Sequence, residues 1–155
     1  MIDVRTEVEV DLPRSEVAAY ASEPDNATSW YKNIKSVEWK TSPPLAEGSR
    51  VAFVAEFLGK RIEYTYEVKA LRPGQQLVMS ASSAPFPMET TYTWEDTQSG
   101  GTKMSIRNRG GPTGVARLAA PLMALQVRRA TRLDLQRLKE ILEGEGTGHD
   151  YGVKG

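Results

Sequence analysis

Three tyrosines, a threonine and an asparagine share the faces of predicted β-strands, and their side chains are well suited to contact a polar atom of a ligand. Tyr64 and Tyr66 lie two apart in one alternating run, Thr90 and Tyr92 in another, and Asn108 in a third. A buried hydroxyl needs a hydrogen-bond partner, and a cavity offers it a ligand or water. The pattern therefore predicts either recognition of a ligand oxygen, or a tyrosine that donates a proton to a carbonyl or leaving hydroxyl.

The usual nucleophiles and bases are scarce in this chain. Cysteine is absent, and the only histidine, His149, lies in a glycine-rich C-terminal segment. A general base must be held within reach of its proton, so we interpret His149 as a solvated tail residue and expect no hydrolase triad. Glu56, Glu63, Glu67 and Glu89 alternate onto the face opposite the tyrosines. A glutamate that instead faced a cavity with a raised pKa would favour an enzyme.

Aromatic residues and methionines accompany the tyrosines on the predicted apolar faces. For any single one, ordinary core packing explains the position at least as well as a ligand site. Together they predict an apolar pocket with a few convergent polar groups. Phe86, between two prolines, either folds over the mouth of this pocket or packs within its own loop. The candidate ligand-binding residues are Trp30, Phe53, Phe57, Tyr64, Tyr66, Met79, Phe86, Tyr92, Asn108, Leu118 and Leu122.

Charge and composition exclude several classes of function. The 155 residues contain 20 basic and 20 acidic side chains, so no broad positive field attracts nucleic acid. The glycine pairs lack the spacing of a phosphate-binding loop, and no metal-ligand motif occurs, so no cofactor or metal is expected. There is neither a signal-like N-terminus nor a long apolar run, which predicts a cytoplasmic protein without stable membrane insertion.

The elements that position these residues follow from periodicity. Apolar and polar residues alternate through residues 2–12, and two short helices are expected between Pro13 and Tyr31. Six further strands, joined by turns rich in glycine and proline, follow between Ile34 and Arg109. Such a meander is antiparallel, with one dry face that needs a cover. The sequence thus predicts an α+β fold of about seven strands, in the order β-α-α-β6-α.

A long C-terminal helix supplies the cover. It is expected from about Val115 to Glu143, with a kink or break near Pro121. Residues 1–143 are predicted to form one domain, and residues 144–155 a flexible tail. The segment 110–114 is either a gate or a simple helix start. The leucines expected to form the buried stripe of the helix are Leu118, Leu122, Leu125, Leu135, Leu138 and Leu142.

Several local signatures, in order along nearly the whole chain, resemble the START-like, helix-grip (SRPBCC) superfamily and especially its bacterial polyketide cyclase/dehydrase and lipid-transport branch. The resemblance implies a sheet that grips the helix around an internal cavity, and it carries over no catalytic motif. The segments concerned are Leu12-Pro-Arg-Ser-Glu-Val, Trp30 after Glu23-Pro-Asp, Gly48-Ser-Arg, Leu71-Arg-Pro-Gly-Gln-Gln-Leu, Gly100-Gly-Thr-Lys-Met and Leu133-Asp-Leu-Gln-Arg-Leu-Lys.

Three hypotheses follow. The first is a binding protein for a small apolar ligand such as a lipid, quinone or aromatic polyketide. The second is a cyclase or dehydratase that uses the cavity tyrosines and Asn108. The third is a protein-interaction module with a filled core, whose partner the sequence does not identify. Arg128, Arg129 and Arg132 are interpreted as a solvated helix face, with an anionic lipid surface or acidic partner as the alternative.

Overall fold

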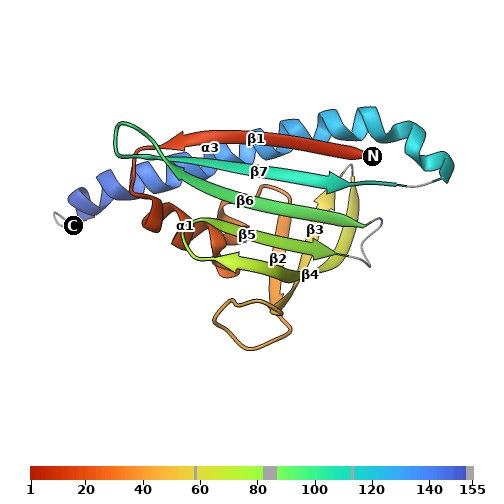
Figure 1. Ribbon diagram of the computed structural model, residues 1–155, viewed down its shortest axis with the longest axis horizontal. Coiled ribbons are helices and arrows are strands. Elements are labelled where there is room, and N and C mark those ends of the chain that lie inside the picture. The colour runs from red at the N-terminus through yellow and green to blue at the C-terminus, as the bar shows by residue number, and fades with distance from the viewer. Residues whose placement is uncertain (58, 82–86, 113, 153–155) are drawn as a thin grey trace.

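The computed structural model describes residues 1–57, 59–81, 87–112 and 114–152 (Figure 1). Its elements are β1 (Ile2–Val10), α1 (Arg14–Ser22), η1 (Pro24–Asn26), α2 (Ala27–Trp30), β2 (Ile34–Trp39), β3 (Arg50–Phe57), β4 (Lys60–Arg72), β5 (Gln76–Ala81), β6 (Met88–Asp96), β7 (Thr102–Gly110), η2 (Gly114–Ala119) and α3 (Ala120–Gly152).

The strands form one antiparallel sheet in the order β1-β7-β6-β5-β4-β3-β2. Strands β2 to β7 pair with their neighbours in sequence, and β1 closes on β7 with Ile2 opposite Gly110 and Val10 opposite Thr102. In Figure 1 the helix α3 runs along β1 and β7, while β2 and β3 curve away from them. The predicted α+β arrangement of a curved antiparallel sheet around a long C-terminal helix is confirmed.

The alternation of side chains fixes which face of each strand is buried. In β1, Ile2 and Val4 are buried and Asp3 and Arg5 are exposed. Ile2 and Val4 pack with Ala120 in a small cluster, while the buried faces of β4 to β7 meet α1 and α3 in the main core. Its most buried large side chains are Trp30, Leu77, Met104, Ile106, Leu135 and Leu138.

The helix predicted from about Val115 is interrupted near Pro121 as expected, but its α-helical part begins later than predicted. The chain forms the 3₁₀ helix η2 up to Ala119, and the α-helix begins at Ala120 with Pro121 in its first turn. Proline is accommodated there because the first amides of a helix have no partner within the helix. The predicted end near Glu143 is wrong, since α3 continues to Gly152. A glycine in a helix costs only about 1 kcal/mol, too little to end a helix by itself.

The buried stripe of α3 differs from the predicted one in its first half. Leu118, Leu122 and Leu125 are exposed, whereas Ala120 is buried and packs with Ile2 and Val4 of β1. The small side chain of Ala120 lets the helix approach β1, and the leucines then point to the other side of the helix. Leu135, Leu138 and Leu142 are buried as predicted.

Candidate functional site

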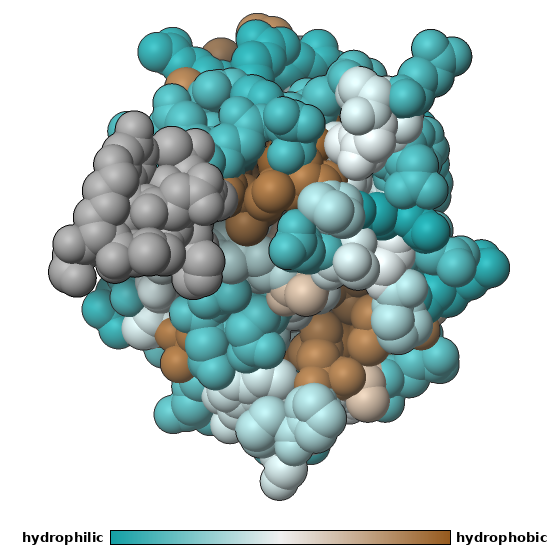
Figure 2. All heavy atoms as spheres, turned by 90° about the vertical axis from the view of Figure 1, so that its left-hand side faces the viewer, coloured by the Kyte–Doolittle hydropathy of each residue, from teal (hydrophilic) through white to brown (hydrophobic). Residues whose placement is uncertain are grey.

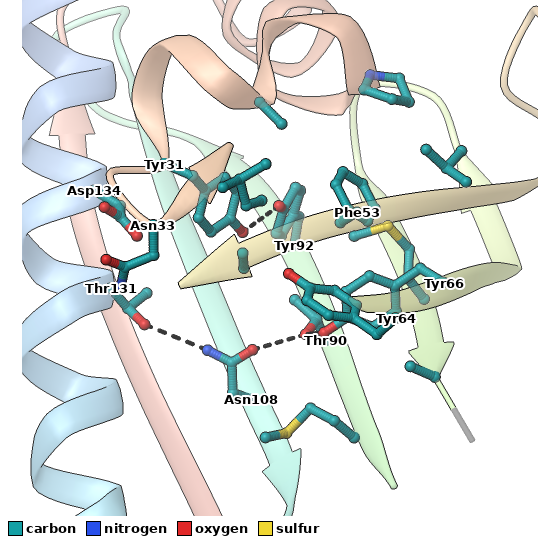
Figure 3. A pocket seen from close by; sticks show the side chains of 18 of the residues that line it. Tyr31, Asn33, Phe53, Tyr64, Tyr66, Thr90, Tyr92, Asn108, Thr131 and Asp134 are labelled. Atoms are coloured by element: carbon teal, nitrogen blue, oxygen red, sulfur yellow. Dashed lines mark hydrogen bonds between the residues drawn. The ribbon is translucent and has the colours of Figure 1, made fainter. Parts of the chain in front are cut away.

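A cavity of about 710 Å³ lies between the concave face of the sheet and the helices. Most of its wall is apolar, and hydroxyl, amide and carboxyl groups are added on the side of α3 (Figure 3). Seen from the end where α3 terminates, the molecular surface is mostly hydrophilic, with apolar patches set in recesses (Figure 2). The predicted residues that line the cavity are Trp30, Phe53, Tyr64, Tyr66, Met79, Tyr92 and Asn108.

Four predicted site residues are not placed in the cavity. Leu118 and Leu122 are exposed and absent from its lining, because the stripe of the helix that faces the sheet is a different one. Phe86 lies outside the described residues, as does the side chain of Phe57. Glu63, expected on the wet face, is exposed and contributes to the rim of the cavity.

A chain of hydrogen bonds crosses the cavity wall from the sheet to the helix. The Thr90 hydroxyl donates to Oδ1 of Asn108 at 2.7 Å, so the Tyr66 hydroxyl, 2.7 Å from Thr90 Oγ1, is the donor to Thr90. Asn108 Nδ2 donates to Thr131 Oγ1 at 3.4 Å, and Thr131 donates to the Val127 carbonyl at 2.7 Å. The chain joins β4, β6, β7 and α3, and every hydroxyl proton in it is used. These groups therefore offer a ligand acceptor sites rather than free hydroxyl protons.

A second polar group comes from two tyrosines of different elements. The hydroxyls of Tyr31 and Tyr92 are hydrogen-bonded to each other (Figure 3). The two hydroxyls have two protons, and one of these makes the hydrogen bond between them. Within the described part of the chain, no third group accepts the other proton. Burial raises the pKa of both phenols, so both stay neutral at physiological pH. The pair therefore presents one O–H donor to the cavity.

Asp134 is the buried carboxylate of the cavity wall and was not predicted, whereas Glu23 and Glu63 line the cavity from less buried positions. It is only 4% exposed, and its Oδ1 accepts a hydrogen bond of 3.0 Å from the backbone amide of Lys32. Burial raises its pKa from 3.8 to about 6, although the Lys32 amide and charge act in the opposite direction. Asp134 is close enough to Tyr31 and Tyr92 for its charge to raise the pKa of both phenols.

The signal for Asp134 is present in the helix but is outweighed by its neighbours. By its place in the sequence, Asp134 belongs with the charged, solvated face that follows the arginines. Yet Thr131 and Asp134 precede the buried Leu138 by seven and four residues, which places all three on one side of α3. Tyr31 and Asn33, which also line the cavity, have no periodic signal because they lie beyond the end of the short α2.

The raised pKa of Asp134 predicts a pH-dependent cost to stability. Between about pH 4 and pH 6 the folded chain holds a proton that the unfolded chain releases, so the free energy of unfolding falls as pH rises. Asp134→Asn removes this pH dependence and is expected to raise the free energy of unfolding at pH 7 by about 2 kcal/mol. This value is smaller than the full pKa shift corresponds to, because water in the cavity screens the charge. Urea unfolding at several pH values measures the difference.

The matched control is Asp96→Asn, which changes an exposed carboxylate paired with Arg14. It is expected to leave the pH profile of the wild-type protein in place. If Asp134→Asn shifted stability equally at pH 4 and pH 7, Asp134 would not be the titrating group.

The described residues contain no group of three or more histidine, cysteine, aspartate or glutamate side chains that would hold a metal ion. Among the same residues, no helix is long and apolar enough to cross a membrane. The cavity is an apolar chamber with a polar side, built from the residues named above. The cavity therefore offers a ligand apolar contact, tyrosine O–H donors from Tyr64 and from the Tyr31–Tyr92 pair, several acceptors and the carboxyl group of Asp134.

Solved structures with the same architecture include proteins from several bacteria. A START superfamily protein from Mycobacterium smegmatis has a TM-score of 0.79 and 13% identity, covering 92% of this chain and 97% of that one. The Zhui aromatase/cyclase from Streptomyces sp. R1128 has a TM-score of 0.77 and 15% identity, over 92% and 94% of the two chains. TTHA0849 from Thermus thermophilus has a TM-score of 0.76 and 18% identity, over 89% and 94%. At these identities the likeness is one of fold.

The comparison with curated proteins finds no match. The family described as polyketide cyclase / dehydrase and lipid transport matches residues 1–143. This range includes every strand and the part of α3 that lines the cavity. The chain therefore belongs to the polyketide cyclase/dehydrase and lipid transport family.

Proposed function

We propose that this protein binds a small apolar or aromatic molecule that carries at least one oxygen, such as a lipid, a quinone or an aromatic polyketide. The observation that carries the proposal is the cavity of about 710 Å³, which falls within the range of about 300 to 1,000 Å³ typical of ligand pockets. The third hypothesis required a filled core, and the cavity does not meet that condition.

The distribution of polar groups gives the ligand an orientation. Phe53, Ala55 and Val51 form an apolar wall on β3, while Asn108, Thr131 and Asp134 gather on β7 and α3. A buried polar group without a partner is costly, so the oxygen of a ligand belongs on the α3 side and its apolar body against β3.

Native mass spectrometry of the purified protein, beside a denatured control, tests the proposal. We expect a co-purifying apolar molecule that is released on denaturation, or uptake of the apolar dye Nile red by a protein purified empty. A protein that is empty and also fails to take up Nile red would contradict a ligand cavity.

Asp134 favours a second candidate, a dehydratase or cyclase acting on a β-hydroxy carbonyl compound. The carboxylate takes a proton from the carbon next to the carbonyl while the free O–H of the Tyr31–Tyr92 pair donates a hydrogen bond to the carbonyl oxygen. The protonated Asp134 then gives this proton to the departing hydroxyl. A double bond forms, water leaves and the carboxylate is restored, so atoms and charge balance.

Incubating the protein with the molecule found by native mass spectrometry separates the two candidates. An enzyme of this type converts the molecule into a product whose mass is lower by one water. The Asp134→Asn protein is expected to bind the molecule but to form none of this product. A ligand recovered unchanged from the wild-type protein supports the carrier.

A further inference from the structure

The outer face of α3 carries the exposed apolar surface of this protein. Apart from Met1, the large apolar side chains that are exposed in the described residues are Leu118, at 77%, Leu122, at 63%, Leu125, at 62%, and Leu133, at 51%. Leu122, Leu125 and Leu133 lie on one side of α3, opposite the stripe that faces the sheet, and Leu118 precedes them in η2. Leucines gathered in this way on one exposed helix face indicate a contact surface.

Basic side chains surround the leucines without acidic counterparts. Arg128, Arg129 and Arg132 are exposed, and none of them forms an ion pair within the described part of the chain. The sequence has no aspartate or glutamate between Asp96 and Asp134, and Asp134 is itself buried in the cavity wall. In a chain whose total charge is zero, this face is a local positive field.

We propose that the outer face of α3, made of Leu122, Leu125, Leu133 and the exposed arginines Arg128, Arg129 and Arg132, docks on an anionic lipid bilayer. An amphipathic helix of this kind lies in the plane of the interface, with leucines among the acyl chains and arginines at the level of the phosphates. Each arginine near such a surface adds electrostatic attraction. This inference does not depend on which molecule the cavity binds.

Charge decides between a bilayer and a second copy of the chain. A symmetric dimer through this face would bring two sets of Arg128, Arg129 and Arg132 together, and like charges across an interface are unfavourable. An anionic lipid surface complements all three.

The same helical segment also connects this face to the cavity. Met123, Val127 and Thr131, on the other side of α3, line the cavity. A bilayer docked on the leucines would therefore lie one helix diameter from the cavity wall, on the order of 10 Å. A ligand dissolved in the membrane would have a short path to the protein.

Co-sedimentation with lipid vesicles tests the docking surface. We expect the protein to bind vesicles of phosphatidylcholine mixed with phosphatidylglycerol and not vesicles of phosphatidylcholine alone. Binding should weaken as salt is added, because the attraction is electrostatic. Leu122→Gln/Leu125→Gln is expected to weaken binding to mixed vesicles by about ten-fold, and Arg128→Gln/Arg129→Gln/Arg132→Gln by more than about ten-fold.

The control variant Lys35→Gln/Arg50→Gln/Arg72→Gln removes the same charge from exposed positions on β2, β3 and β4 and should bind like the wild-type protein. Because all these positions are exposed, thermal unfolding should be unchanged in every variant. No binding to mixed vesicles, or equal losses in the control, would overturn the proposal. A dimer in solution that the leucine variant dissociates would overturn it in favour of self-association.

Discussion

Replacing Ala55 with tryptophan is expected to reduce the affinity for the ligand by about 50- to 100-fold while leaving the protein folded. Ala55 lies in β3, is buried and lines the apolar wall of the cavity. The indole ring would occupy space that the ligand needs. A ligand that loses about 100 Å² of apolar contact forfeits about 2.5 kcal/mol, which is about 50- to 100-fold in affinity.

The matched control for this substitution is Ala52→Trp on the same strand. Ala52 is outside the lining of the cavity, since its side chain points to the other face of the sheet. Nile red titration and thermal unfolding of both variants make the comparison. Wild-type affinity in a folded Ala55→Trp protein would contradict the assignment of the cavity as the binding site.

The second large effect is expected from Gly110→Ala, at the end of β7. Gly110 has φ +137°, a conformation that residues with a side chain rarely adopt, and an added Cβ would lie 2.2 Å from the carbonyl oxygen of Pro87. That oxygen also accepts a hydrogen bond from the Gly111 amide at 3.2 Å, so it is held in place. We expect Gly110→Ala to lower the free energy of unfolding by about 3 kcal/mol or more, because the backbone must move to relieve the contact.

Gly74→Ala separates the close contact from the cost of the backbone conformation alone. Gly74 also has a positive φ, +75°, but nothing lies within 4 Å of an added Cβ. The free energy of unfolding of this variant is expected to fall by only about 1 kcal/mol. Urea unfolding measures the free energy of unfolding of both variants. Equal decreases in the two variants would show that the contact with Pro87 adds nothing to the destabilisation.

The tight packing of Gly110 also bears on the segment 110–114. An added Cβ at Gly111 would lie 3.3 Å from Ile2, so the first two glycines pack against β1 and β6. An added Cβ at Gly114 would have nothing within 4 Å. That this segment gates the cavity stays a prediction, and any hinge in it is better placed at Gly114 than at Gly110.

The strand faces could be predicted because side chains alternate strictly along a strand. Once Tyr64, Tyr66 and Asn108 were placed in alternating runs, their shared face followed, and all three line the cavity. The break before α3 was equally local, since proline lacks the amide that a helix interior needs. These features depend only on interactions between residues that are close in the sequence, so they could be predicted from it.

The orientation of α3 was decided only by the tertiary structure. Its leucines occur on more than one side of the helix, so periodicity did not determine which side packs on the sheet. The approach of Ala120 to β1 settled it, turning Leu122 outward and Asp134 into the cavity. The bond between Tyr31 and Tyr92, 61 residues apart, likewise depends on how α2 lies over the sheet. The chemistry of the cavity therefore rests on contacts between distant segments, which local sequence patterns do not encode.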